Sequence, residues 1–210
     1  MWWGGVVGAG VRKLLARYFK ITIPNRYPLP PMQELQDRVQ GVRYLTKLDL
    51  KNRFNLMRMK AGDEWKMGVR TRYGLYEFKV ILFGLSNTPS TFQDMMNHIF
   101  SDMLDLGLMI YMDDILMYGK TQAEHDEIVR NTLKRLQDNS LAVAADKCVW
   151  RTREVEFLGY VLSQDRVKMA QDKGEAVLEW ETPRLLTEVQ SFLGFANFYR
   201  QFIQDYSQVV

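Results

Sequence analysis

Two adjacent aspartates interrupt an apolar stretch of the chain, Ile110–Tyr118, which reads IYMDDILMY. Burying a carboxylate is costly unless a positive charge or hydrogen bonds compensate it, and two neighbouring carboxylates also repel each other. Asp113 and Asp114 therefore either form a hairpin turn that faces water or face a cation. Tight hairpins favour Asn-Gly or Asp-Gly, so an Asp-Asp turn is a poor fit. Carboxylate oxygens suit Mg²⁺, which makes the pair a candidate metal site.

A third aspartate, Asp49, lies between two leucines in the segment 44–50, YLTKLDL, whose composition favours a strand. Taken alone, Asp49 is an outward-facing polar residue of a half-buried strand. If this strand lies beside the 110–118 hairpin, three carboxylates converge. Convergent carboxylates that hold two divalent ions about 3.5–4 Å apart promote in-line displacement at phosphorus, because one ion activates the attacking hydroxyl and the other steadies the leaving group.

Helices and further strands must position these aspartates. Apolar residues recur at helical spacing over 90–105, which predicts an amphipathic helix there. Thr121 and Glu124 form a capping box that predicts the start of a second helix. Alternation and turn residues predict further strands at 56–60, 64–71, 76–83, 141–150 and 154–162.

The pattern becomes helical beyond Ser163, and this change is the expected domain boundary. A short helix is expected around 171–180. A long amphipathic segment, opened by a capping box of Thr187 and Gln190, is expected to follow it.

The composition limits the class of protein. The chain has 210 residues, 47% of them hydrophobic and 25% charged, which suits one sizeable globular domain or two small ones. A net charge of +3 permits a polyanionic partner without requiring one. One cysteine, Cys148, and two histidines exclude an internal disulfide framework and a cysteine-rich zinc site. The opening segment is short, glycine-broken and without a basic n-region, so we expect no signal peptide or membrane segment and an intracellular protein.

Several motifs, in this order and spacing, resemble the reverse transcriptase of gypsy-type LTR retrotransposons. They are KLDL, RTRYGLYEF, FGLSNTPSTFQ, YMDD, KCVW followed by VEFLGYVLS, and VQSFLGFANFYRQFI. The similarity runs from about Ile21 to Ser207, nearly the whole chain. The resemblance implies an α+β fold: a right-hand polymerase palm with a ferredoxin-like antiparallel sheet and helices, a helical thumb and truncated fingers.

The same resemblance divides the chain. Residues 1–20 match nothing in the family, residues 21–163 are expected to form the palm with residual fingers, and residues 164–210 the thumb. The family's connection region, RNase H, integrase and protease have no counterpart in these residues, so a partial copy is expected.

The resemblance also implies roles for site residues. Asp49, Asp113 and Asp114 would be the catalytic triad and the ligands of two Mg²⁺ ions, with Asp49 and Asp113 as principal ligands. Phe54 would be an aromatic gate that excludes a ribose 2′-OH, although the sequence pattern alone favours a core aromatic at this position. Gln93, whose spacing alone places it on the polar face of helix 90–105, would contact the incoming nucleotide. The nucleotide site would be completed by Tyr111 and by Met112, which by type alone is a packing residue.

The implied function is RNA-directed DNA synthesis, in which a primer 3′-OH is extended with dNTPs. The expected partners are an RNA or DNA template with a DNA primer, dNTPs and, as a further option, a second copy of the chain, in the cytoplasm or nucleus and without a membrane. Arg200, Gln190 and Gln201 would contact phosphates, although solvated side chains explain them equally, as they do Arg70 and Arg72. Two alternatives remain: a catalytically silent nucleic-acid-binding remnant, and a chain that folds only within a longer polyprotein.

Overall fold

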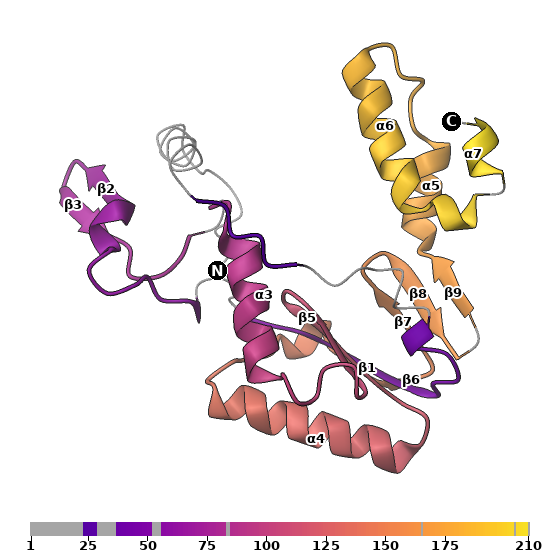
Figure 1. The fold of residues 1–210 in the computed structure, drawn as a ribbon, viewed down its shortest axis with the longest axis horizontal. Helices are drawn as coiled ribbons and strands as arrows, with labels where there is room; N and C mark the ends of the chain where they lie inside the picture. Colours follow the sequence, from indigo (N-terminus) through magenta and orange to yellow (C-terminus); the bar gives the residue numbers. More distant parts are fainter. Residues whose placement is uncertain are drawn as a thin grey trace.

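The computed structural model describes residues 23–28, 37–51, 56–82, 85–164, 166–203 and 205–209. Figure 1 shows a central sheet with two helices against it, a small hairpin at one end of the molecule and a group of short helices at the other. The described helices and strands form an α+β arrangement, as the sequence predicts.

The central sheet has four antiparallel strands in the order β4-β5-β1-β6. β1 pairs with β5 from Tyr44 opposite Gly119 to Asp49 opposite Asp114. The strand predicted at 44–50 is therefore confirmed, and it lies beside the 110–118 hairpin as the convergence of the aspartates requires. The strand bounds are Leu108–Tyr111 for β4, Asp114–Gly119 for β5, Tyr44–Asp49 for β1 and Val149–Thr152 for β6.

Apolar side chains cover both faces of the central sheet. On one face, Leu48, Ile110 and Ile115 pack against the buried Phe92 and Met96. On the other face, alternate residues of the same strands, Leu45, Leu116 and Tyr118, form a second core. This core also contains Phe157, Tyr160 and Leu162, which belong to a smaller sheet described below. A strand buried on both faces leaves little tolerance for a register shift, because a slip by one residue would exchange its two sets of side chains.

Two helices, α3 (Thr88–Ile99) and α4 (Gln122–Asp138), lie on the first face (Figure 1). The prediction of a helix over 90–105 is wrong at its end, because the helix stops at Ile99. There, Arg135 of α4 donates to the Ile99 carbonyl (3.0 Å) and pairs with Asp102, which fixes the chain as it leaves the helix. The predicted capping box at the start of α4 is confirmed, since Thr121 Oγ1 accepts from the Glu124 N–H and the Glu124 carboxylate accepts from the Thr121 N–H.

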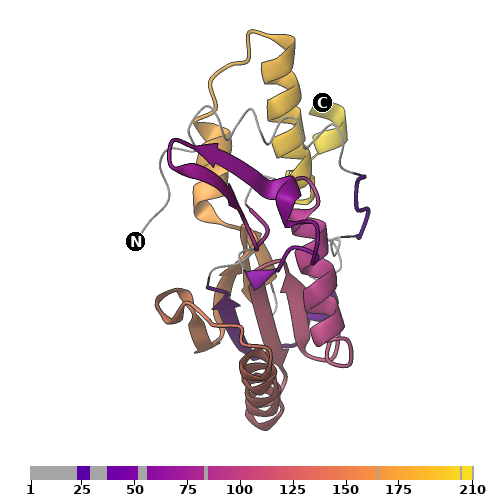
Figure 2. The same cartoon turned by 90° about the vertical axis from the view of Figure 1, so that its left-hand side faces the viewer.

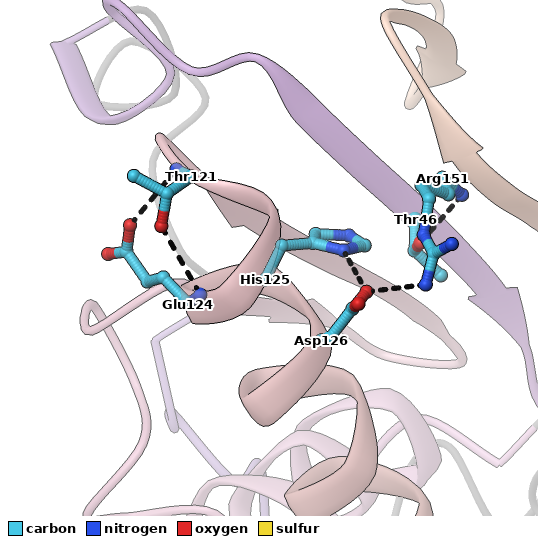
Figure 3. A network of polar contacts seen from close by, with 6 residues as sticks. All are labelled: Thr46, Thr121, Glu124, His125, Asp126 and Arg151. Atoms are coloured by element: carbon cyan, nitrogen blue, oxygen red, sulfur yellow. Dashed lines mark hydrogen bonds and ion pairs between the residues drawn. The ribbon is translucent and has the colours of Figure 1, made fainter.

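A polar network anchors α4 to the edge of the sheet (Figure 3). Arg151 of β6 donates to Asp126 (2.7 Å), and its backbone N–H bonds to Thr46 Oγ1 (3.0 Å). Beside them lies His125, 1% exposed, with Nδ1 3.6 Å from Asp126 Oδ1, just beyond hydrogen-bond distance. Burial lowers the pKa of His125, because charging the imidazole there would cost solvation.

The segment between β1 and α3 differs from its prediction. Residues predicted as a strand at 64–71 begin as a 3₁₀-helix, η2 (Glu64–Met67), and only then form β2 (Gly68–Thr71). The strand predicted at 76–83 is β3 (Gly74–Glu77), which starts and ends earlier. β2 and β3 form a two-stranded hairpin, and no other strand among the described residues pairs with it. The hairpin therefore ends where its own two strands stop pairing, although the alternating pattern continues.

The second sheet consists of β7 (Glu154–Phe157), β8 (Tyr160–Ser163) and β9 (Arg166–Met169). The single strand predicted at 154–162 is therefore wrong, because Leu158 and Gly159, both with positive φ, form a tight turn inside it. Of the strand predicted at 141–150, only Val149 and Trp150 lie in a strand, β6, and the 3₁₀-helix η3 (Ala145–Lys147) precedes them. The expected domain boundary near residue 163 falls in the β8–β9 hairpin.

Four short helical elements follow: α5 (Gln171–Leu178), α6 (Leu186–Phe198), η4 (Arg200–Phe202) and α7 (Tyr206–Val209). The helix expected around 171–180 is confirmed as α5. The Thr187 capping box is wrong, because Glu188 accepts the backbone N–H groups of Arg184 and Leu185 and starts α6 earlier. Figures 1 and 2 show these helices and the β2–β3 hairpin above the central sheet, on the side opposite α4. Among the described helices, none is long and apolar enough to cross a membrane.

Candidate active site

The three aspartates meet at one end of the central sheet. Asp49 is the last residue of β1 and Asp114 the first of β5, and the two are directly opposite in the antiparallel register. Asp113 occupies the turn before β5, where it is 7% exposed, and its carbonyl accepts the Leu50 N–H at 3.0 Å. The strand pairing therefore brings the backbone positions of Asp49, Asp113 and Asp114 together from two distant segments.

Side-chain alternation places Asp49 and Asp114 on a known face. Leu45 and Leu116 lie on the face that packs against the second sheet, and alternate residues of a strand share a face. Asp49 lies four residues from Leu45, and Asp114 two residues from Leu116, so both project from this face. The carboxylates are therefore turned away from α3 and α4 and toward the side on which Figure 1 shows the β2–β3 hairpin and the C-terminal helices.

The turn of the hairpin consists of Met112 and Asp113, since Tyr111 pairs with Asp114. The expectation that Asp113 and Asp114 together form the turn is therefore shifted by one residue. Met112 has φ +53°, a left-handed conformation that costs a residue with a side chain about 1–2 kcal/mol. Such strain persists only where surrounding contacts hold it in place.

Gln93 supplies those contacts. Its Oε1 accepts the Met112 N–H at 2.7 Å, and its Nε2 donates to the Ile110 carbonyl at 3.1 Å. Gln93 is fully buried (0% exposed), so its placement on the polar face of α3 is wrong: it lies beside the apolar stripe of Phe92 and Met96. Its contact with a nucleotide stays a prediction, and the geometry gives the side chain the role of holding the hairpin.

A short chain of hydrogen bonds extends from Gln93 to the segment 23–28, called here the N-terminal connector. Nε2 of Gln93 also donates to Asn97 Oδ1 (2.8 Å), and Asn97 Nδ2 donates to the Tyr27 hydroxyl (3.0 Å). The connector itself is tied to α3, because the Asn25 N–H bonds to Asn87 Oδ1 at 2.9 Å. Asn97 and Tyr27 escaped the sequence analysis, although the spacing of four between Gln93 and Asn97 is a helical contact that could have indicated the first of them.

Lys47 is a further residue that the sequence analysis missed. Its Nζ lies 3.4 Å from Asp114 Oδ1, and the two side chains are 22% and 23% exposed. Lys47 lies two positions before Asp49 on β1, so both side chains share the face of the aspartates. The spacing of two between Lys47 and Asp49 in a predicted strand was the signal that could have indicated Lys47.

The donor set suits a divalent ion. Aspartate oxygens are the hard ligands that Mg²⁺ prefers, and strands of a rigid sheet hold them. In the part of the chain that the structure describes, no three His, Cys, Asp or Glu side chains are arranged so that they could together hold a metal ion. The structure thus brings together the backbone positions of Asp49, Asp113 and Asp114, but their three side chains are not arranged around one common metal position.

The remaining predicted residues are spread over the molecule. Tyr111 is half-buried at the end of β4, and Phe54 lies outside the described residues. Arg70 and Arg72 are exposed on the β2–β3 hairpin, and Arg72 stacks on Tyr73 with its guanidinium 4.5 Å from the ring centre. In the C-terminal helices, Gln190 and Arg200 are exposed, and the side chain of Gln201 is not among those that the structure describes.

Comparison with known proteins identifies the family of the chain. The family model described as reverse transcriptase (RNA-dependent DNA polymerase) matches residues 11–162, beginning earlier than the motifs indicated. The Tf2-3 and Tf2-7 transposon polyproteins of Schizosaccharomyces pombe are each 36% identical to this chain over 197 residues. The matches cover 94% of this chain, which spans about 15% of the length of these relatives.

Solved structures show the same fold. The foamy viral protease-reverse transcriptase in complex with double-stranded DNA is similar with a TM-score of 0.83 and 22% identity, over 93% of this chain and 34% of that one. The complex of the foamy viral enzyme with an RNA/DNA hybrid gives 0.71 and 23%, over 87% and 25%. The chain belongs to the reverse transcriptase family, whose members are RNA-directed DNA polymerases, and its fold is that of their palm with thumb-like helices.

Proposed function

We propose that this chain catalyses template-directed DNA synthesis at the aspartate cluster. The observation that carries the proposal is the register of β1 and β5, which sets Asp49 opposite Asp114 with Asp113 in the adjoining turn. In the reaction, the primer 3′-hydroxyl loses its proton to solvent and attacks the α-phosphorus of a dNTP. A bond between the 3′-oxygen and the α-phosphorus forms, the bond from the α-phosphorus to the oxygen that bridges to the β-phosphate breaks, and pyrophosphate leaves.

Asp49 and Asp113 would be the principal ligands of two Mg²⁺ ions, and Asp114 the third carboxylate of the site. Bound there, the ions would lower the pKa of the attacking hydroxyl and neutralise charge on the leaving group. The chain's own contribution is to hold the carboxylates in place. Gln93 holds the turn that carries Asp113, and strand pairing with β5 holds Asp49.

The proposed substrate is an RNA or DNA template annealed to a DNA primer, together with dNTPs. Related structures contain double-stranded DNA or an RNA/DNA hybrid, and the cluster faces the side on which the β2–β3 hairpin and the C-terminal helices stand. Exposed Arg70, Arg72 and Arg200 are suited to phosphate contacts, which would make duplex binding fall with rising salt. Phe54 and Tyr111 are proposed to line the nucleotide site, with Met112 beside them.

Primer extension tests the proposal. The purified chain is incubated with an RNA template, a labelled DNA primer, dNTPs and Mg²⁺, and is compared with Asp113→Asn and with Asp94→Asn, the same change at an exposed position of α3. Extension by the wild type and Asp94→Asn, but not by Asp113→Asn, is expected. Duplex binding without extension by any of the three would instead identify a silent nucleic-acid-binding remnant.

A further inference from the structure

Lys47 lies in the aspartate cluster, and the proposed reaction leaves it without a role. Across an antiparallel pair, like charges directly opposite each other destabilise the sheet, and Asp49 and Asp114 form such a pair. Lys47 pairs with Leu116, which makes it the diagonal neighbour of Asp114, within reach of a long side chain.

The contact between Lys47 and Asp114 is sheltered. Nζ lies 3.4 Å from Oδ1, and less than a quarter of each side chain is exposed. Salt screens a pair in this setting less than it screens a pair on the open surface. A cation fixed at this position acts on Asp114 and on any further positive charge that approaches the cluster.

We propose that Lys47 is a built-in counter-ion of the aspartate cluster, a positioning residue whose ammonium holds Asp114 when no divalent ion is bound and lowers the affinity of the cluster for such an ion. The inference rests on the proposed function, because it assigns Asp49, Asp113 and Asp114 to a divalent-ion site. It predicts opposite effects of removing the lysine charge: a less stable protein without metal, and a tighter metal site.

The effect on metal binding follows from charge. Replacing Lys47 by methionine keeps most of the side-chain volume and removes one positive charge from beside the carboxylates. A divalent ion some 7 Å from that charge would then bind about five- to tenfold more tightly, with a water-like dielectric between them. Lys47→Arg keeps the charge and should leave the affinity unchanged.

Mn²⁺ titration followed by electron paramagnetic resonance measures this affinity in the full chain without nucleotide or nucleic acid. The control is Lys134→Met, the same change at an exposed position of α4. Tighter Mn²⁺ binding in Lys47→Met, with wild-type affinity in Lys47→Arg and Lys134→Met, is expected. Equal affinity in Lys47→Met and the wild type, or equal tightening in Lys134→Met, would overturn the inference.

Thermal unfolding gives a second readout. Without metal, Lys47→Met should unfold at a lower temperature than the wild type. Added Mn²⁺ should reduce this difference in unfolding temperature, because the ion replaces the missing counter-charge. If Lys47→Met does not fold, Lys47→Gln provides the same titration with a polar side chain of similar reach. A deficit that Mn²⁺ leaves unchanged would contradict the counter-ion role.

Asp49→Asn separates this inference from the proposed function. If Asp49→Asn weakens Mn²⁺ binding while Lys47→Met leaves it unchanged, the site exists and only the role of Lys47 is wrong. If Asp49→Asn has no effect on Mn²⁺ binding, the divalent-ion site itself is wrong and the proposed function fails with it.

Discussion

Replacing Gln93 by methionine should loosen the hairpin that carries Asp113. Gln93 is 0% exposed, and its amide accepts from the Met112 N–H and donates to the Ile110 carbonyl. Methionine has a similar length and replaces the buried volume, so the change removes hydrogen bonds without opening a large cavity. Each backbone group left without its partner costs about 1–3 kcal/mol, so the two together predict a loss of about 2–6 kcal/mol.

Urea unfolding measures this loss, with Gln137→Met as the control because it makes the same change at an exposed position of α4. Gln93→Met should lower the unfolding midpoint at an unchanged slope, and Gln137→Met should change stability by less than about 0.5 kcal/mol. Primer extension by folded Gln93→Met should also be slower, since the left-handed conformation of Met112 loses the bond that holds it. A loss below about 0.5 kcal/mol in Gln93→Met would refute the role assigned to this side chain.

Three further outcomes are expected. Burial lowers the pKa of His125, so the imidazole binds a proton less readily in the folded than in the unfolded chain. The contribution of neutral His125 to stability is therefore present above about pH 6.5 and is lost as the pH falls below that value. His125→Gln should flatten the decline in unfolding midpoint below about pH 6.5, and His98→Gln, the same change at an exposed position, is the control. Gly107→Ala should cost about 2–4 kcal/mol in urea unfolding, because its φ is +97° and a Cβ would lie 2.2 Å from Ile128 Cδ1. Gly41→Ala, at φ +74° with open space around it, should cost only about 1 kcal/mol, and an equal loss at both glycines would contradict the steric explanation.

The sequence was informative about the site where its signals were local and strong. The strand at 44–50 and the hairpin at 110–118 are both predicted from local patterns, and the structure confirms both and pairs them as β1 and β5. The capping box of α4 is likewise a local signal, because Thr121 and Glu124 bond to each other's backbone.

The errors arise where a contact distant in sequence decides the local structure. The end of α3 is set by Arg135, which is 36 residues away from Ile99. Gln93 is polar and lies in a helix, which suggests a solvated face, but its partners are backbone groups of the hairpin 17 and 19 residues further along. The contact of Lys47 with Asp114 depends on the pairing of β5 with β1, which the sequence pattern around Lys47 does not indicate.

The central claim is that Asp49 and Asp113, 64 positions apart in the sequence, act in one catalytic site. Single-nucleotide incorporation on an RNA template with a DNA primer, in Mg²⁺, tests it with Asp49→Asn, Asp113→Asn and the double variant. Each single change should lower the rate by about 10³-fold or more, and the double variant should be no slower than the slower single one, because residues that act as a unit are not additive. A wild-type rate in Asp49→Asn, or losses that multiply in the double variant, would contradict a shared site.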